Sequence, residues 1–261
     1  MKKVNNRIIK GVLCLVTLST MLIGQNNILT KGYAQDTYSE VAGESHTGSF
    51  SVDSLTLQPG ATTTSINLNW YAPAGTTVAK IQFGDQTYDV TAKPLTSPTE
   101  IKSDKYTDTG KLVCKTTISN LKPDTKYTYY ISNDGGTTWS KEYNYTTPSS
   151  NEFTFGFTSD PQIKENKEIN SEGWNPSDET NQTGWATMME TLEKQGVDLV
   201  VSAGDQVEDQ NWGKSSEYEA FFAPEEMTSI PYAPAVGNHD RHYMFADHFN
   251  LPNQMESLTG L

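Results

Sequence analysis

The chain has 261 residues, two cysteines, and 32 acidic against 19 basic residues, which gives a net charge of −13 at neutral pH. Such an acidic surface repels the phosphates of nucleic acids and of anionic lipids, so neither is an expected partner. Two cysteines, Cys14 and Cys114, exclude a framework of several disulfides, and packed cores must therefore supply the stability.

Residues 1–34 have the pattern of a secretory signal peptide. Four basic residues lie within the first ten, and residues 11–24 are almost entirely apolar or small. That stretch is shorter than the roughly 20 residues of a spanning helix. Gly32-Tyr33-Ala34 offers small residues where a signal peptidase reads, so we expect cleavage after Ala34. We predict a secreted or cell-surface protein with no stable membrane insertion; an uncleaved amino-terminal anchor is the alternative.

Cleavage would leave 227 residues, which allows two modest domains. Residues 1–34 hold five basic and no acidic residues, so the remainder has 32 acidic against 14 basic residues, a net charge of −18. Cys114 would be the last cysteine, and its apolar neighbours predict a buried side chain. Residues 35–48 are polar and without periodicity, and we expect a disordered lead-in.

Residues 49–148 predict an all-β sandwich, because short alternating segments are broken by turn residues and no helical period interrupts them. Strands are expected near 55–57, 66–70, 81–83, 88–90, 112–118, 127–131 and 143–145. Trp70 is expected in the core. The run Leu121 to Tyr127 resembles the segment that opens a late strand of fibronectin type III domains. That resemblance implies that Tyr127 packs at a corner, with its hydroxyl bonded back to the chain.

Residues 151–261 change to an α/β pattern. A helix with one apolar face is expected before Gly196, and a second one follows the capping box of Ser216 and Glu219. The apolar positions are Trp185, Met188, Met189 and Leu192 in the first helix and Tyr218, Phe221 and Phe222 in the second. Buried strands are expected at 153–157, 197–203 and 232–236. The succession β-α-β-α-β predicts a parallel sheet.

Polar residues follow each of these three strands: Asp160 and Gln162, then Asp205, then Asn238, His239 and Asp240. Carboxyl ends of neighbouring parallel strands meet at one crevice, where open α/β sheets place their sites. Taken singly, each run is more often a structural turn, but the three together predict a metal site.

The residue types suggest separate roles at this site. The carboxylate of Asp205 can bridge two cations, Asp160 can hold one, Asn238 the other, and Gln162 can add a weak ligand. Oxygen ligands suit Mg²⁺, Mn²⁺ or Fe, and nitrogen ligands move the choice towards Zn or Fe. His239 is placed to stabilise an equatorial oxygen or to protonate a leaving group. Asp240 is predicted to fix the tautomer of His239.

These runs resemble the first three motifs of the calcineurin-like metallophosphoesterase superfamily. With a fibronectin-like domain in front, the arrangement is similar to a purple acid phosphatase. The resemblance implies two divalent metal ions, with Asp160 and Asp205 on the first, Asp205 and Asn238 on the second, and His239 as the acid. A hydroxide held by the metals would attack a phosphate ester, most simply a phosphomonoester.

The sequence departs from this pattern at three points. Gln162 stands where the superfamily usually has histidine and purple phosphatases have glycine, and Glu208 replaces the tyrosinate that colours them, so we predict a colourless protein. The later histidine and the Gly-His-x-His run that complete the site do not occur. We therefore expect an amino-terminal part of the enzyme, weakly active or inactive by itself. Alternatives are a non-catalytic exported binding protein with a decayed phosphatase domain, or a phosphodiesterase or nucleotidase. The oligomeric state stays open.

Overall fold

The structure is a computed structural model that describes residues 10–11, 38–95, 110–163, 178–208, 215–240 and 242–252. Apart from residues 10–11, the predicted signal peptide lies outside these ranges, as does the side chain of Ser216 in the predicted capping box. None of the helices in the described part of the chain combines the length and the apolar character needed to span a bilayer.

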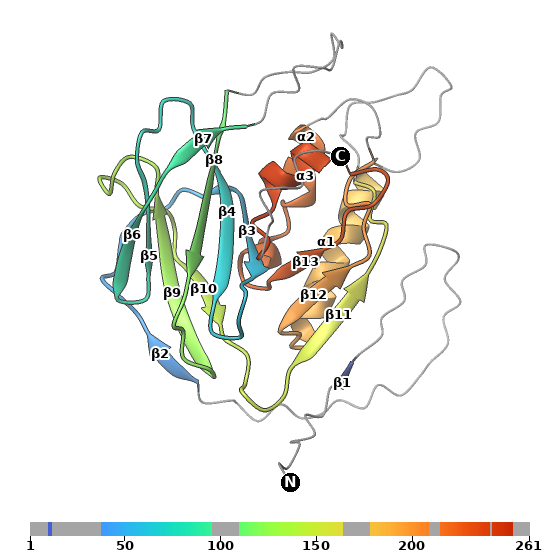
Figure 1. Ribbon diagram of the computed structural model, residues 1–261, viewed down its shortest axis with the longest axis horizontal. Helices are drawn as coiled ribbons and strands as arrows, with labels where there is room; N and C mark the ends of the chain where they lie inside the picture. Colours follow the sequence, from blue (N-terminus) through green and yellow to red (C-terminus); the bar gives the residue numbers. More distant parts are fainter. Residues whose placement is uncertain are drawn as a thin grey trace.

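Residues 38–148 contain two β-sheets that face each other (Figure 1). One has the order β10-β9-β5-β6, with β2 beside β9, and the other has the order β3-β4-β8-β7. Except at β2, all the pairings are antiparallel. The strands are β2 (Ser39–Val41), β3 (Asp53–Pro59), β4 (Ile66–Ala72), β5 (Ala79–Phe83), β6 (Gln86–Val90), β7 (Ala92–Pro94), β8 (Leu112–Ile118), β9 (Thr125–Ser132) and β10 (Tyr143–Thr146). The prediction of an all-β domain is confirmed.

One apolar core lies between the two sheets. Leu68 and Trp70 of β4, Ile81 of β5 and Tyr129 of β9 are fully buried in it. Cys114 is equally buried, opposite Trp70 in register, which confirms the two placements predicted from the sequence. Burial raises the pKa of the Cys114 thiol to about 12, so this cysteine is an unreactive apolar side chain.

The segment at 35–48, expected to be a disordered lead-in, contains a short strand. Ser39–Val41 form β2, which pairs in parallel with the start of β9. Further along, the ring of His46 stacks on Trp139 at a centroid distance of 4.3 Å. A three-residue edge strand is held by backbone hydrogen bonds and needs no apolar alternation. Its sequence therefore gives no periodic signal.

The strands β11, β12 and β13 of the second half form a parallel sheet, as predicted, and β1, from residues 10–11, pairs in parallel with β11 at its edge, which was not predicted. α1 connects β11 to β12, and α2 connects β12 to β13. β11 has the expected five residues, shifted by one position, whereas β12 and β13 are shorter than expected. The elements are β1 (Lys10–Gly11), β11 (Thr154–Thr158), α1 (Asp178–Lys194), β12 (Leu199–Ser202), α2 (Ser215–Phe221), the 3₁₀ helix η1 (Glu225–Thr228), β13 (Tyr232–Pro234) and α3 (His242–His248).

α1 packs with the predicted face inward. Trp185, Met189 and Leu192 are buried, and the indole Nε1 donates to the carbonyl of Phe221 at 2.8 Å. The helix ends as predicted at Gly196, whose φ of +64° is the left-handed conformation that favours glycine.

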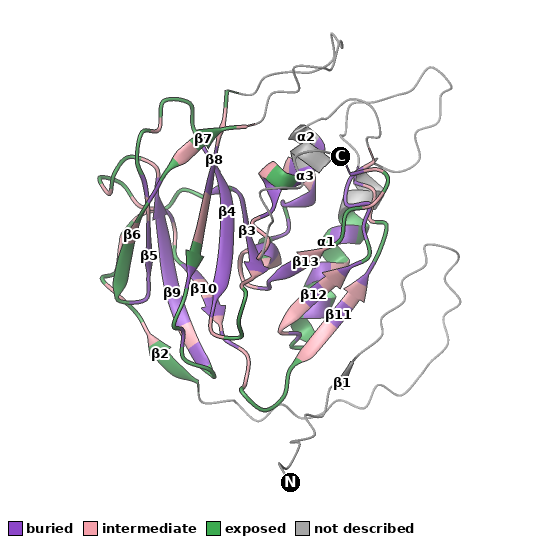
Figure 2. Cartoon of the chain, in the orientation of Figure 1, coloured by how far each residue is buried: buried purple, intermediate pink, exposed green. Residues whose placement is uncertain are grey.

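The two halves pack against each other through the sheet that contains β3 and β4. Figure 1 shows these strands beside β13 and α3. Figure 2 shows β4 buried along its whole length, whereas β2 and β6 are largely exposed. β4 is buried on both faces because the inner one carries Leu68 and Trp70, while Asn67, Asn69 and Tyr71 lie on the outer one. The α/β half covers that outer face.

Candidate metal centre

The loops after β11 and β12 are joined by their backbones. The amide of Asp160 donates to the carbonyl of Gly204, and the amide of Gln162 donates to the carbonyl of Asp205, both at 3.0 Å. Beyond the loops, Ile163 and Val207 form a further parallel bridge. The first two predicted motifs therefore lie side by side at the carboxyl edge of the sheet.

The loops after β12 and β13 touch so closely that glycine is required at the contact. A Cβ added to Gly237 would lie 2.0 Å from Oδ1 of Asp205, and one added to Gly204 would lie 2.8 Å from Cα of Gly237. Across this contact the backbone amide of His239 donates to Oδ1 of Asp205 at 2.8 Å. The third motif is thereby placed against the second, 34 residues earlier in the chain.

Asp240 binds both of these loops. Its carboxylate accepts hydrogen bonds from the backbone amides of Asp205 (2.9 Å), Gln206 (3.1 Å) and Gly237 (2.9 Å). Only 4% of the residue is exposed. Burial raises the pKa of Asp240 above its ordinary value, and the three amide donors oppose this only in part. Asp240 therefore fixes the backbone of the site.

The predicted partnership between Asp240 and the ring of His239 is not what the structure shows. Nδ1 of His239 lies 2.7 Å from the carbonyl oxygen of Glu208, and the Glu208 carboxylate is 3.9 Å from the same nitrogen. A carbonyl oxygen only accepts, so Nδ1 carries the proton and Nε2 is the nitrogen that can exchange one. The tautomer is set by the loop after β12, because the Asp240 oxygens are already committed to backbone amides.

Three of the four predicted ligands have a left-handed backbone. The φ angles are +53° at Asp160, +42° at Gln162 and +55° at Asp205, values that are uncommon outside glycine. Such conformations persist where the surroundings hold them, and they concentrate at functional sites. Asp160 and Asn238 are exposed, Gln162 is half-buried and Asp205 is buried.

The side chains at these strand ends offer mainly oxygen donors to a metal ion. Oδ1 of Asp205 accepts the His239 amide, and no residue in the described ranges bonds its second carboxylate oxygen. With the exposed carboxylate of Asp160 and the exposed amide of Asn238, the oxygen donors suit a hard divalent cation. Within the described residues, no group of three histidine, cysteine, aspartate or glutamate side chains is gathered as a metal site. The ligands predicted from the sequence are two carboxylates, of Asp160 and Asp205, and two side-chain amides, of Gln162 and Asn238.

Two supporting residues were missed by sequence reasoning. Gln206 is fully buried; the amide orientation that satisfies both neighbours places its nitrogen 2.5 and 3.0 Å from the Asp240 oxygens and its oxygen 2.9 Å from the Ser202 hydroxyl. Tyr218, predicted only as helix core, places its hydroxyl 3.5 Å from Oδ1 of Asp240. Only the position of Gln206 inside the Gly-Asp run could have signalled its role.

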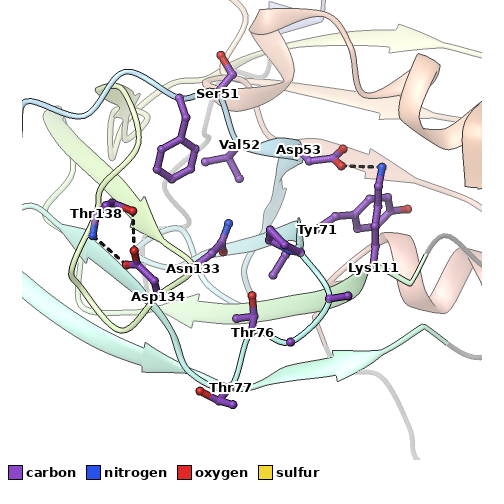
Figure 3. Close-up of a pocket in the computed structure, with 15 residues that line it drawn as sticks. Ser51, Val52, Asp53, Tyr71, Thr76, Thr77, Lys111, Asn133, Asp134 and Thr138 are labelled. Atoms are coloured by element: carbon purple, nitrogen blue, oxygen red, sulfur yellow. Dashed lines mark hydrogen bonds and ion pairs between the residues drawn. The ribbon is translucent and has the colours of Figure 1, made fainter.

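A separate cavity of about 760 Å³ lies at the end of the β domain and contains none of the predicted ligands (Figure 3). Its charged groups are compensated. Lys111 bonds Asp53 at 2.7 Å and Glu219 of α2 at 2.5 Å. The carboxylate of Asp134 accepts from the backbone amides of Thr137 and Thr138. The cavity is therefore distinct from the site at the strand ends.

Comparison with known proteins gives two family matches. Residues 52–147 match the family described as "Purple acid Phosphatase, N-terminal domain", and residues 153–259 match "Calcineurin-like phosphoesterase". A search of curated proteins gives no match.

One similar solved structure is a purple acid phosphatase isolated from seeds of yellow lupin (Lupinus luteus), with a TM-score of 0.60 and 18% sequence identity. The similarity covers 77% of this chain and 41% of the lupin chain. At this identity the likeness concerns the fold alone. Because the match covers 77% of this chain, it extends over both of the regions matched by the two families.

Proposed function

We propose that the chain is the amino-terminal part of an exported, metal-dependent phosphomonoesterase, because residues 153–259 match the calcineurin-like phosphoesterases and residues 52–147 match the purple acid phosphatase N-terminal domain. The observation that carries the proposal is the contact between Oδ1 of Asp205 and the amide of His239. It joins the ends of β12 and β13, while the Asp160 amide joins β11 to the same edge. Three motifs far apart in sequence thus meet at one place.

Asp160, Gln162, Asp205 and Asn238 would hold the metal ions. Two divalent ions, when bound, would lower the pKa of water and hold the phosphoryl oxygens. The candidate ions are Fe, Zn, Mn and Mg.

His239 is the proposed acid. With Nδ1 donating to the Glu208 carbonyl, the protonated ring would present its second proton at Nε2, where it can pass to the leaving oxygen of the ester. The Glu208 carboxylate, 3.9 Å from Nδ1, adds a favourable charge beside the protonated ring. Asp240 keeps the loops in register and takes no part in proton transfer.

Calorimetric titration with Mn²⁺ tests the proposal on the chain as it stands, because the readout does not depend on turnover. We expect two tight equivalents for the wild-type chain and a loss of binding for Asp205→Ala, since this residue would touch both ions. Asp85→Asn is the matched control: it removes one exposed carboxylate from a turn of the β domain. Binding of no Mn²⁺ by the wild-type chain would favour a non-catalytic exported protein instead.

For the full-length enzyme, the rates of hydrolysis of para-nitrophenyl phosphate and of bis(para-nitrophenyl) phosphate separate a phosphomonoesterase from a phosphodiesterase. We expect the monoester to be preferred. The absence of a visible charge-transfer band in the Fe-loaded chain would agree with Glu208 replacing a tyrosinate ligand.

We further propose that the β domain is of fibronectin type III type. The opposing orders β3-β4-β8-β7 and β6-β5-β9-β10 follow the A-B-E-D and C-F-G arrangement of immunoglobulin-type sandwiches. The hydroxyl of Tyr127 accepts from the backbone amide of Lys122 at 2.8 Å, which supports the tyrosine corner inferred from the sequence. Mass analysis of the exported chain would test cleavage after Ala34.

A further inference from the structure

The helix that follows the third site loop is anchored to the β domain at its far end. α3 begins two residues after Asp240. Nζ of Lys115, in β8, donates to the carbonyl of Ala246 and, at 2.8 Å, to that of Phe249. The last carbonyls of a helix have no partner within it, and a cation is favoured there. Lys115 therefore caps α3 from the other domain.

Asn250, just beyond α3, makes a second set of hydrogen bonds to the same sheet. Its side-chain nitrogen donates to the carbonyls of Leu68 (3.2 Å) and Thr116 (2.8 Å). Its backbone amide donates to Oε1 of Gln58 at 3.0 Å, and its backbone carbonyl accepts from the side-chain nitrogen Nδ2 of Asn67 at 2.7 Å. One residue thus contacts β3, β4 and β8, which explains why polar side chains are buried on that face.

His248 provides a third contact between α3 and the β domain, and it also connects this contact to Asp240 of the site. It is 1% exposed and hydrogen-bonds the hydroxyl of Tyr71 in β4. The imidazole also stacks on Tyr218, with ring centroids 3.8 Å apart, and the hydroxyl of Tyr218 faces Asp240. Packed side chains therefore run without interruption from β4 of the β domain to the carboxylate that fixes the site loops.

We infer that the N-terminal β domain positions the Asn238–Asp240 loop through α3, so that Lys115 and Asn250 act as positioning residues for metal binding. The inference rests on the proposed function, because it assigns a role towards the same metal ions. The loop is held on one side by Asp205 and on the other by α3. Asn238 is exposed between these two holds, so its position depends on both of them.

The expected consequence is a change in affinity. Residues that hold metal ligands in place typically contribute about 10- to 100-fold to metal affinity. Loosening the far end of α3 leaves every proposed ligand present but lets the loop that carries Asn238 move. Metal binding should then weaken without being abolished, in contrast to the loss expected for Asp205→Ala.

The test is Mn²⁺ titration of the whole chain and its variants, at a temperature at which each is shown to be folded. Lys115→Met and Asn250→Ala should each weaken Mn²⁺ binding about tenfold. Lys115→Arg keeps the donors and should restore most of the affinity. Lys126→Met is the control, since it removes the same charge from β9, where the side chain is 41% exposed and pairs with Glu40 at 3.8 Å.

The outcomes separate the two proposals. If the wild-type chain binds Mn²⁺ and the Lys115→Met and Asn250→Ala variants bind it equally well, the positioning role is overturned while the proposed function stands, even if both variants melt earlier. If the wild-type chain binds no Mn²⁺, the proposed function fails first and the inference falls with it. Should Lys115→Met not fold, Asn250→Ala and Tyr71→Phe decide, because Tyr71→Phe removes only the hydroxyl that bonds His248.

Discussion

Two glycines set how closely the second and third site loops approach. Gly204 and Gly237 lie against each other, and the Asp205 carboxylate occupies the space where a Cβ of residue 237 would be. This close approach lets the backbone amide of His239 donate to Asp205. Any side chain larger than that of glycine at position 237 would prevent it. The geometry of the site thus depends on the absence of a Cβ at residue 237 as well as on the polar side chains around it.

Gly237→Ala should therefore destabilise the chain and disturb the site together. The added methyl group would lie 2.0 Å from Oδ1 and 2.4 Å from the amide nitrogen of Asp205. We expect the free energy of unfolding to fall by about 1–3 kcal/mol, as in overpacked cores. Urea denaturation measures this. Gly184→Ala in α1 is the control, since nothing lies within 4 Å of the added Cβ, and it should gain about 0.5–1 kcal/mol.

His248 makes stability depend on pH. Burial lowers its pKa from 6.5 to about 3, so the folded chain keeps the ring neutral where the unfolded chain takes up a proton. Stability from this residue is complete above pH 6.5 and is lost as the pH falls towards 3, at up to about 1.4 kcal/mol per pH unit.

His248→Phe keeps a ring against Tyr218 and removes the titration. The variant should lose less stability than the wild-type chain between pH 6.5 and about 4, whatever its stability at pH 7. Urea denaturation across that range gives the comparison. If the free energy of unfolding changed with pH in the same way for both proteins, the pKa of His248 would be the same in the folded and the unfolded chain.

At the scale of elements, the pattern of apolar residues predicted most of what the structure contains. The face of α1, the three parallel strands and the β domain all follow from periodicity, because each buries a regular row of side chains. β2 left no signal, since a short edge strand needs no apolar alternation. The anchoring of α3 left none either, because Lys115 and Asn250 act across domains and their partners lie more than a hundred residues away.

The end of α1 offers a test of one predicted element. The amide of Gly196 donates to the carbonyl of Glu193 at 2.8 Å, and that of Val197 donates to the carbonyl of Leu192 at 3.3 Å. This paired closure needs the left-handed φ of Gly196. Gly196→Ala should lower the free energy of unfolding by about 1 kcal/mol. Thermal denaturation followed by circular dichroism measures the change, and an unaltered Tm would mean that the closure does not need glycine.

At the scale of the whole molecule, the sequence predicted that three motif loops lie at one edge of the sheet, but not how they are held there. Asp160, Asp205 and Asn238 follow β11, β12 and β13, and the order of these strands places the three loops side by side. The contacts of Asp240 could not be predicted in the same way. A carboxylate beside a histidine suggests a ring partner, and only the close approach of the loops shows that backbone amides already occupy its oxygens.

The β-domain side of the interface between the two halves is largely polar, and this bears on how the β domain behaves alone. The β domain has its own closed core between its sheets. Its face towards the α/β half carries Thr56, Gln58, Asn67 and Asn69, all buried in the whole chain. Side-chain atoms of Thr56, Gln58 and Asn69 have no hydrogen-bond partner in the described structure. Exposing such groups to water costs little, because water satisfies them.

Residues 38–148 should therefore fold as an independent, monomeric domain when expressed alone. Polar interfaces of this kind separate more readily than apolar ones. We expect a single cooperative thermal transition by near-ultraviolet circular dichroism, with Trp70 in its buried environment, and a monomer by size-exclusion chromatography. An unfolded or aggregated product would show instead that the β domain depends on the α/β half. In that case the two halves would stabilise each other: α3 would stabilise the sheet of β3, β4 and β8, and that sheet would hold α3 in place.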